Sequence, residues 1–344
     1  MKARLIDYLV CPASREKLRL KIQERDGEEI IRGSLVSPAG QEYSIDNGIP
    51  RFVSSEKYTG MFGFEWNRHA RVYLDNKDQF RSYPISSHLT QKLGLTPDSV
   101  QNKIVLDIGC GTGAYAATVA EWGAREIVCV DLSSAVEAAY SNTKHFGNVH
   151  VIQGDLFNLP LRHEGFDLVY SIGVLHHTPN TAKAFLSLVS FVKESGIIAI
   201  WVYPDCPDLT QRLSDSVRTV TTRMNHQVLY TLCWLAVPAY YIYKIPFVGK
   251  AIFHFLPPLS MHPYWEDRVL DTFDWYSPTY QWKHTYPEVY RWFREANLTD
   301  IHLLDFPVSI WGRKPGKTVK QLDGQAWVDR QAQIESHVAN VTID

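Results

Sequence analysis

The sequence predicts an α/β protein: a doubly wound sheet with helices on both faces, a mostly helical insertion after the fifth strand, and a small β-rich unit at the N-terminus. Three observations predict this fold. Short apolar runs alternate with helical segments from residue 103 to 203, three glycines crowd the end of the first run, and the alternation stops over 204–285 before it resumes. Alternation of this kind is typical of helices packed on a largely parallel sheet.

The residues before the alternating pattern form two segments. Residues 1–54 are predicted to be the β-rich unit, because the turn signals DNG at 46–48 and Pro50 close its apolar runs. Residues 55–102 link this unit to the sheet and contain a short helix near 86–94.

The segment 103–203 carries the core of the predicted sheet. Its first strand is a short, β-branched apolar run that a glycine ends, and the next helix is rich in alanine and ends near Gly123. Ser133 or Ser134 would cap the second helix. The expected strands are 104–108, 126–132, 149–155, 166–173 and 196–204, and the expected helices are 114–124, 133–146 and 181–195.

The insertion at 204–285 is predicted to form a cap on the sheet. A helix at 286–298 and a closing pair of strands then complete the sheet within 286–314, and 315–344 is a polar tail. The cap contains an apolar run, 226–243, without Lys, Arg, Asp or Glu.

This run is short for a transmembrane helix. Pro238 interrupts it and Lys244 ends it, whereas a bilayer span needs about 20 apolar residues. We therefore expect a buried helical lid. The alternative is a helix that lies on a membrane surface, with peripheral contact through 226–259.

Charge and cysteine content argue against several classes of protein. The chain has 35 Lys and Arg against 37 Asp and Glu, which does not favour a nucleic-acid partner. Its five cysteines are scattered, as is usual for free thiols in a reducing compartment. The N-terminus lacks the long apolar run and cleavage site of a signal peptide. We expect a cytoplasmic protein.

The stretch KIVLDIGCGTGAYA, residues 103–116, predicts a ligand-binding loop. Glycines after the first strand let a ligand approach the backbone and the start of the next helix. Gly109, Gly111 and Ala114 also fit the GxGxxA pattern of nicotinamide-binding proteins. The acids favour another ligand: Asp107, Asp131 and Asp155 end three successive strands, which suits an amino-acid tail, a ribose and an adenine.

At these motifs, LDIGCGTG, VDLS, GDLFNLP and DLVYSIGVLHHTPN, the chain resembles the class I S-adenosylmethionine (SAM) methyltransferases that act on small molecules. The resemblance covers 103–203 closely and 286–313 loosely. It implies a Rossmann-like methyltransferase sheet with SAM as cofactor and S-adenosylhomocysteine as product. The implied cofactor-binding residues are Asp107, Gly109, Gly111 and Gly113 for the methionine part, Asp131 for the ribose hydroxyls, Leu132, Asp155 and Leu156 for the adenine, and Ser171 beside them.

The acceptor site is predicted less sharply. His176 or His177, after the fourth strand, could be a base for a hydroxyl acceptor, and His284 in the cap is a third candidate. Each could equally be a packing or capping residue. The candidate substrate-binding residues are Phe64, Trp66, Asp274, Trp275, Tyr276 and Tyr280, which could instead only dock the cap and the N-terminal segment on the sheet.

The N-terminal unit also carries a resemblance. LIDYLVCPASREKLRL followed by EYSIDNGIPRFV resembles the small zinc-ribbon subunits that activate tRNA and translation-factor methyltransferases. Such zinc sites need four ligands. Here only Cys11 remains, Ser14 stands at its partner's place, and the next cysteine is Cys110. We expect no metal, and a unit that packs on the catalytic domain in cis.

The sequence thus predicts a SAM-dependent methyltransferase acting on a small, hydrophobic or aromatic molecule at O or N. One alternative is a SAM-binding protein with other chemistry or a scaffold role. Another is methylation of RNA or protein, which the N-terminal unit suggests and the balanced charge disfavours. Nicotinamide oxidoreduction is the most distant. The oligomeric state is not predicted.

Overall fold

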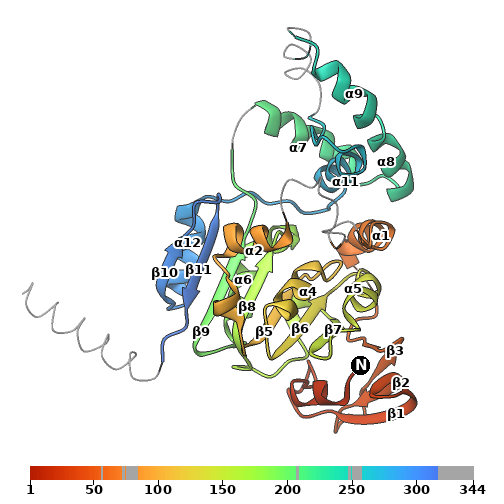
Figure 1. The fold of residues 1–344 in the computed structure, drawn as a ribbon, viewed down its shortest axis with the longest axis vertical. Helices are drawn as coiled ribbons and strands as arrows, with labels where there is room; N and C mark the ends of the chain where they lie inside the picture. The colour runs from red at the N-terminus through yellow and green to blue at the C-terminus, as the bar shows by residue number, and fades with distance from the viewer. Residues whose placement is uncertain are drawn as a thin grey trace, which may run out of the picture.

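We describe a computed structural model of the chain over residues 1–55, 57–71, 74, 84–206, 209–246, 249 and 258–316. Most of the predicted polar tail and residues 207–208, 247–248 and 250–257 of the cap lie outside these residues. Figure 1 shows the sheet at the centre, the N-terminal unit at one side of it and the helical cap at one end.

The central sheet has seven strands in the order β10-β11-β9-β8-β5-β6-β7. The five strands from β5 to β9 are parallel, and β11 and β10 close the sheet as an antiparallel pair. The predicted α/β fold is therefore confirmed. The strands are β5 Ile104–Ile108, β6 Glu126–Asp131, β7 Val149–Gln153, β8 Phe166–Ile172, β9 Val192–Trp201, β10 Thr299–Leu303 and β11 Ser309–Arg313.

Helices cover both faces of the sheet. Phe185 of one helix and Phe293 of another belong to the hydrophobic cluster on one face, and Leu89 and Val119 belong to the cluster on the other. The first face carries α6 Thr181–Val189 and α12 Tyr286–Glu295; the second carries α2 Ile85–Leu93, α4 Ala114–Glu121 and α5 Val136–Thr143, with the short α3 Pro97–Val100 between. This two-sided cover is why β5 is buried along its whole length.

One predicted boundary is wrong. The helix expected over 181–195 ends at Val189, and β9 begins at Val192. Phe191 and Val192 are buried in the core, and Val192 pairs with Phe166 of β8. Ser195 then has a φ of +61°, and the strand continues past it to Trp201. The pairing of residues 192–201 with β8 therefore outweighs the helical sequence pattern that extends to residue 195.

The N-terminal unit is a four-stranded antiparallel sheet, which continues onto the edge of the central sheet. A parallel bridge joins Arg51 to Gln153 of β7, and the Phe52 N–H donates to the Gln153 carbonyl at 2.9 Å. Cys11 is buried with its Sγ 3.3 Å from the Tyr43 hydroxyl. The contacts fit the expected packing in cis. The strands are β1 Arg19–Asp26, β2 Glu29–Val36, β3 Glu42–Asp46 and β4 Ile49–Pro50.

The cap lies beyond the carboxyl ends of the parallel strands (Figure 1). Its core joins Leu229, Tyr230 and Phe273 to Met61 of the N-terminal helix α1 Gly60–Arg68. The cap helices are α7 Leu209–Thr221, α8 His226–Cys233, α9 Ala236–Tyr243 and α11 Trp265–Tyr276.

The lid predicted for 226–243 is only half buried, which corrects the expectation. Leu235 and Tyr241 are 61% and 67% exposed, and Trp234 is 45% exposed. The run is apolar all round, so one side packs on α11 and the other faces outward. No helix in the described ranges is long and apolar enough to cross a membrane. Membrane contact through 226–259 stays a prediction.

Candidate functional site

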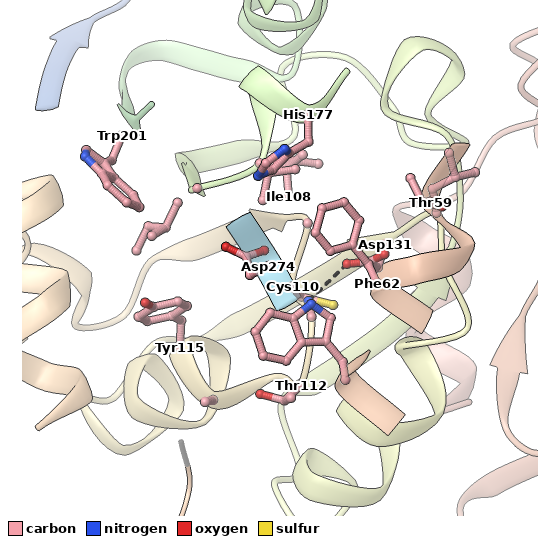
Figure 2. A pocket seen from close by; sticks show the side chains of 18 of the residues that line it. Thr59, Phe62, Ile108, Cys110, Thr112, Tyr115, Asp131, His177, Trp201 and Asp274 are labelled. Carbon is pink, nitrogen blue, oxygen red and sulfur yellow. Dashed lines mark hydrogen bonds between the residues drawn. The ribbon is translucent and has the colours of Figure 1, made fainter. Parts of the chain in front are cut away.

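A cavity of about 550 Å³ lies where the parallel strands end, between the glycine loop, α1 and α11. Figure 2 shows Asp131, His177, Phe62 and Asp274 around it, brought together from four separate parts of the chain. The order of the strands reverses between β5 and β8, which is the position at which doubly wound sheets bind ligands.

The three glycines of the loop are needed for different reasons. A Cβ on Gly109 would lie 2.3 Å from Val174 Cγ2, and one on Gly113 would lie 3.2 Å from Ala139 Cα, where α4 packs on α5. Gly111 has a φ of +51° and its position faces the Trp66 indole at 3.6 Å. Gly109 and Gly111 line the cavity, whereas Gly113 is outside the lining. Only the first two can meet a ligand directly.

Asp131 ends β6, Asp155 lies two residues after the end of β7, and both line the cavity. The contacts with ribose and adenine that were expected of them stay a prediction. Asp131 Oδ2 accepts the Gly111 N–H at 3.0 Å, and Oδ1 accepts the Ser133 N–H and hydroxyl at 2.9 and 2.8 Å. Asp155 accepts the Phe157 N–H at 3.0 Å. These bonds orient the two carboxylates at the edge of the sheet. Leu132 and Leu156 line the cavity beside them.

Asp107 and Ser171 lie behind this surface. Asp107 is buried and accepts the Tyr170 hydroxyl at 2.9 Å, and burial raises its pKa to about 7. Ser171 donates to the Ile108 carbonyl at 3.0 Å. Neither side chain lines the cavity. Their placement supports the loop from beneath, and the cofactor contact that the resemblance implies for them stays a prediction.

His177 is the candidate base that reaches the cavity. It lies in the short 3₁₀ turn after β8, Leu175–His177, and its Nδ1 donates to the Tyr280 carbonyl at 2.8 Å. Because a carbonyl only accepts, this bond leaves the lone pair of Nε2 available. Burial lowers the pKa of His177 to about 4, so the ring is neutral at pH 7.

The other two histidines are placed as packing residues. His176 is fully buried, accepts the Tyr203 N–H at 3.3 Å and has its ring 3.9 Å from the Tyr203 ring. His284 bonds the Thr181 hydroxyl at 2.9 Å and lies 3.0 Å from Glu288. Neither lines the cavity.

The predicted substrate-binding residues divide in the same way. Trp66, Asp274 and Trp275 line the cavity. Phe64 packs between cap aromatics, 5.8 Å from the Tyr230 ring. The remaining two also lie outside the lining: Tyr276 donates to the Pro258 carbonyl at 2.6 Å, and the Tyr280 ring meets Tyr58 edge-on at 5.4 Å.

Sequence reasoning missed several lining residues, among them Tyr58, Phe62, Lys92, Tyr115, Trp201, Tyr203 and Asp267. A signal existed for Asp267. Asp267, Asp271 and Asp274 are spaced i, i+4 and i+7 on α11, which places them on one face of a helix. The others have no local pattern, because tertiary packing alone brings them to the cavity.

The buried ring of His177 makes the stability of the fold depend on pH. The unfolded chain takes up a proton there below pH 6.5, whereas the folded chain does so only near pH 4, so the free energy of unfolding falls as pH falls through this window. We expect the wild type to lose about 1 kcal/mol per pH unit more than His177→Gln between pH 6.5 and 4.5. Urea unfolding at several pH values measures this, and equal slopes would contradict a buried neutral ring.

Comparison with known proteins places the core in a described class. Residues 106–200 match the family model described as a methyltransferase domain. The tRNA U34 carboxymethyltransferase of Pseudoalteromonas atlantica is 34% identical over 101 residues, 28% of this chain and 31% of the relative. The sterol 24-C-methyltransferase of Yarrowia lipolytica is 29% identical over 124 residues, 34% of this chain and 32% of the relative.

Among solved structures, a SAM-dependent methyltransferase from Mesorhizobium loti is 26% identical, with a TM-score of 0.28, over 30% of this chain and 47% of that chain. This chain spans about a third of the length of the two curated relatives. With the strand order and the glycine loop, the family match makes residues 106–200 a SAM-dependent methyltransferase domain.

The cavity fits SAM as the cofactor of this domain. The backbone at Gly109 and Gly111 is open to a close approach, and Asp131 and Asp155 offer carboxylate oxygens at the ends of adjacent strands. Leu132 and Leu156 supply apolar surface between them.

Proposed function

We propose that the protein transfers the methyl group of SAM to a small aromatic acceptor, at N or O. The observation that carries the proposal is one cavity shared by the glycine loop, the neutral His177 and a set of aromatic side chains from α1, β9 and α11. SAM supplies an activated methyl on its sulfonium. The chain itself has to bind both molecules, exclude water and accept a proton.

The residues divide this work by position. The loop and Asp131 hold the cofactor at one end of the cavity, and His177 Nε2 takes a proton from the acceptor. Phe62 and Trp275 close the cavity from α1 and α11 and exclude water. In this account Asp107 keeps the loop in place from below.

The cavity limits the acceptor. About 550 Å³ must hold both SAM and the acceptor, so the acceptor is small. Its walls carry the rings of Phe62, Trp201, Tyr203 and Trp275, which favours an aromatic molecule. The apolar run 226–243 contributes no residue to the cavity lining, so it does not favour a bulky hydrophobic acceptor.

Methylation of RNA is the second candidate, because one relative is named a tRNA carboxymethyltransferase. That match covers 28% of this chain, a length close to that of the cofactor-binding core. A core of this kind serves many acceptors. Since Lys and Arg do not outnumber Asp and Glu over the whole chain, charge does not favour RNA over a small molecule.

Asp131→Ala should weaken SAM binding tenfold or more and leave the fold intact. The change removes the acceptor for ribose hydroxyls and releases the Gly111 N–H that now positions the loop. Calorimetry with SAM measures the first effect, and the circular dichroism melt checks the second. Unchanged affinity in a folded variant would mean that the ribose lies elsewhere.

The function itself is tested by incubating the full chain with methyl-labelled SAM and a library of small phenols and aryl amines. We expect label to enter an acceptor with equimolar release of S-adenosylhomocysteine. Label that instead enters added tRNA, with none entering any small molecule, would favour the second candidate.

A further inference from the structure

One face of α11 lines the acceptor side of the cavity with carboxylates. Asp267, Asp271 and Asp274 recur at i, i+4 and i+7, and all three line the cavity with Trp275 next to them. Figure 2 shows Asp274 within the ring of cavity residues, between Tyr115 and His177. An acidic stripe inside an otherwise aromatic cavity is unexpected for a site that binds only neutral rings.

Neutral donors hold two of these carboxylates. Asp271 accepts the Ser260 hydroxyl at 2.9 Å, and Asp274 accepts the Tyr203 hydroxyl at 2.9 Å. Within the described part of the chain, neither forms a salt bridge with Lys or Arg. Arg218 donates to the Trp275 and Pro278 carbonyls at 2.8 and 2.6 Å, and its charge also offsets part of the rise that burial causes in the pKa of Asp274. Asp267 lies 3.5 Å from His262 Nδ1.

A fourth acid interacts electrostatically with this stripe. Glu65 of α1 is fully buried, and in the ranges the structure describes neither carboxylate oxygen has a hydrogen-bond partner. Its pKa is raised first by burial and then by Asp274 and Asp271, so it lies within electrostatic range of both, although it is not part of the cavity lining. Buried acids without partners are unfavourable until a cation or donor joins them.

The basic groups near the cavity offset only part of this set. Lys92 lies 3.7 Å over the Trp201 ring, and burial lowers its pKa to about 8, so it is still mostly charged at pH 7. Burial raises the pKa of Asp274, and the charges of Arg218 and Lys92 offset part of that rise. The basic group that acts on Asp271 is His262. His88 and His177 have pKa values lowered to about 4 by burial, and His262 faces Asp267. A metal ion is not favoured either, since the described residues contain no group of three or more ligands placed to hold one.

We propose that the acceptor is an arylalkylamine, an aliphatic primary amine that carries an aromatic ring, and that it enters as its ammonium ion, with Asp271 and Asp274 as the counter-charge and the rings of Trp275, Trp201 and Phe62 as its apolar walls. This inference rests on the proposed function and specifies its substrate class. Aromatic rings add cation–π attraction to the carboxylates at such a site. The reaction is then N-methylation.

The step balances as follows. The bound R–NH₃⁺, held by the α11 carboxylates, gives one proton to His177 Nε2 and becomes R–NH₂. Its nitrogen lone pair forms the new N–CH₃ bond as the C–S bond breaks, and the pair of the broken bond returns to sulfur. The products are R–NH₂–CH₃⁺ and neutral S-adenosylhomocysteine, and the proton leaves from His177. Burial raises the pKa of Asp271 to about 6, so this carboxylate is mostly ionised at pH 7 and can serve as the counter-charge.

The experiment compares matched pairs of probes on the full chain, with and without saturating S-adenosylhomocysteine. Benzylamine, 2-phenylethylamine and tryptamine are titrated beside benzyl alcohol, 2-phenylethanol and tryptophol by calorimetry at pH 7. We expect at least one cation to bind tenfold or more tightly than its neutral partner. If no cation exceeds its alcohol in either state, including the case of no binding at all, the inference is overturned.

Variants of α11 test whether its carboxylates cause the preference for cations. The double variant Asp271→Asn/Asp274→Asn should reduce the cation preference to threefold or less and keep the affinity for S-adenosylhomocysteine. Glu266→Gln is the matched control, because Glu266 is exposed on the same helix, and it should keep the preference. A preference that survives the double variant contradicts the α11 site. Failure to bind S-adenosylhomocysteine would contradict the proposed function separately, since the probes are also titrated without it.

Discussion

Gly109→Ala should reduce SAM affinity at least a hundredfold and destabilise the fold by about 2–4 kcal/mol. A Cβ at this position would lie 2.3 and 2.4 Å from the two Cγ atoms of Val174, and the backbone φ of +74° disfavours any side chain. The loop would therefore have to move away from the cavity. Calorimetry with SAM and urea unfolding measure the two effects.

The second-site variant Val174→Ala distinguishes a local clash from general damage. It removes both Cγ atoms and leaves Val174 Cβ, which the new methyl group would meet at 2.8 Å. Gly109→Ala/Val174→Ala should therefore recover part of the stability and keep the cost of this contact together with φ strain of about 1 kcal/mol. Gly111→Ala is the contrast, because its Cβ would meet nothing nearer than the Trp66 indole at 3.6 Å. Normal SAM affinity in Gly109→Ala would show that this loop does not hold the cofactor.

His177→Gln should lower kcat by about 10²–10⁴-fold and change the Kd for SAM less than threefold. Glutamine cannot take the proton that Nε2 can take, and the Nδ1 bond to the Tyr280 carbonyl fixes which nitrogen faces the cavity. Initial rates with a saturating acceptor, corrected for the folded fraction, measure the effect.

His176→Gln is the neighbouring control. Its ring lies against Tyr203 outside the cavity, so the variant should lose stability and keep kcat per folded molecule. If His176→Gln loses kcat and His177→Gln does not, the assignment of the base is wrong. If both keep it, no histidine at this turn takes the proton, and the α11 carboxylates remain as the acceptors.

The cofactor half of the site was largely predictable from sequence because its signals are local. An apolar run ended by glycine fixes β5, and an acid at a strand end reaches the carboxyl edge of a parallel sheet whatever the helices do. Asp131 and Asp155 therefore line the cavity as expected. Asp107 and Ser171 lie within their strands. Successive side chains of a strand point to opposite faces of the sheet, and sequence position alone does not say which of them reach the ligand.

The acceptor half was not predictable to the same degree. His176 and His177 are neighbours, and only the direction of a short turn decides that one meets the cavity and the other meets Tyr203. The run 226–243 is apolar all round, so its pattern does not specify which side is buried. The acidic face of α11 was readable from its spacing, whereas its approach to Glu65 depends on how α1 packs against the cap.

The most direct test of the central claim is calorimetry of the purified full chain with SAM and with S-adenosylhomocysteine. We predict that both bind one to one with a Kd in the micromolar range or tighter, and that Asp131→Ala weakens both. A folded protein that binds neither, or that binds a nicotinamide dinucleotide in their place, would contradict the account.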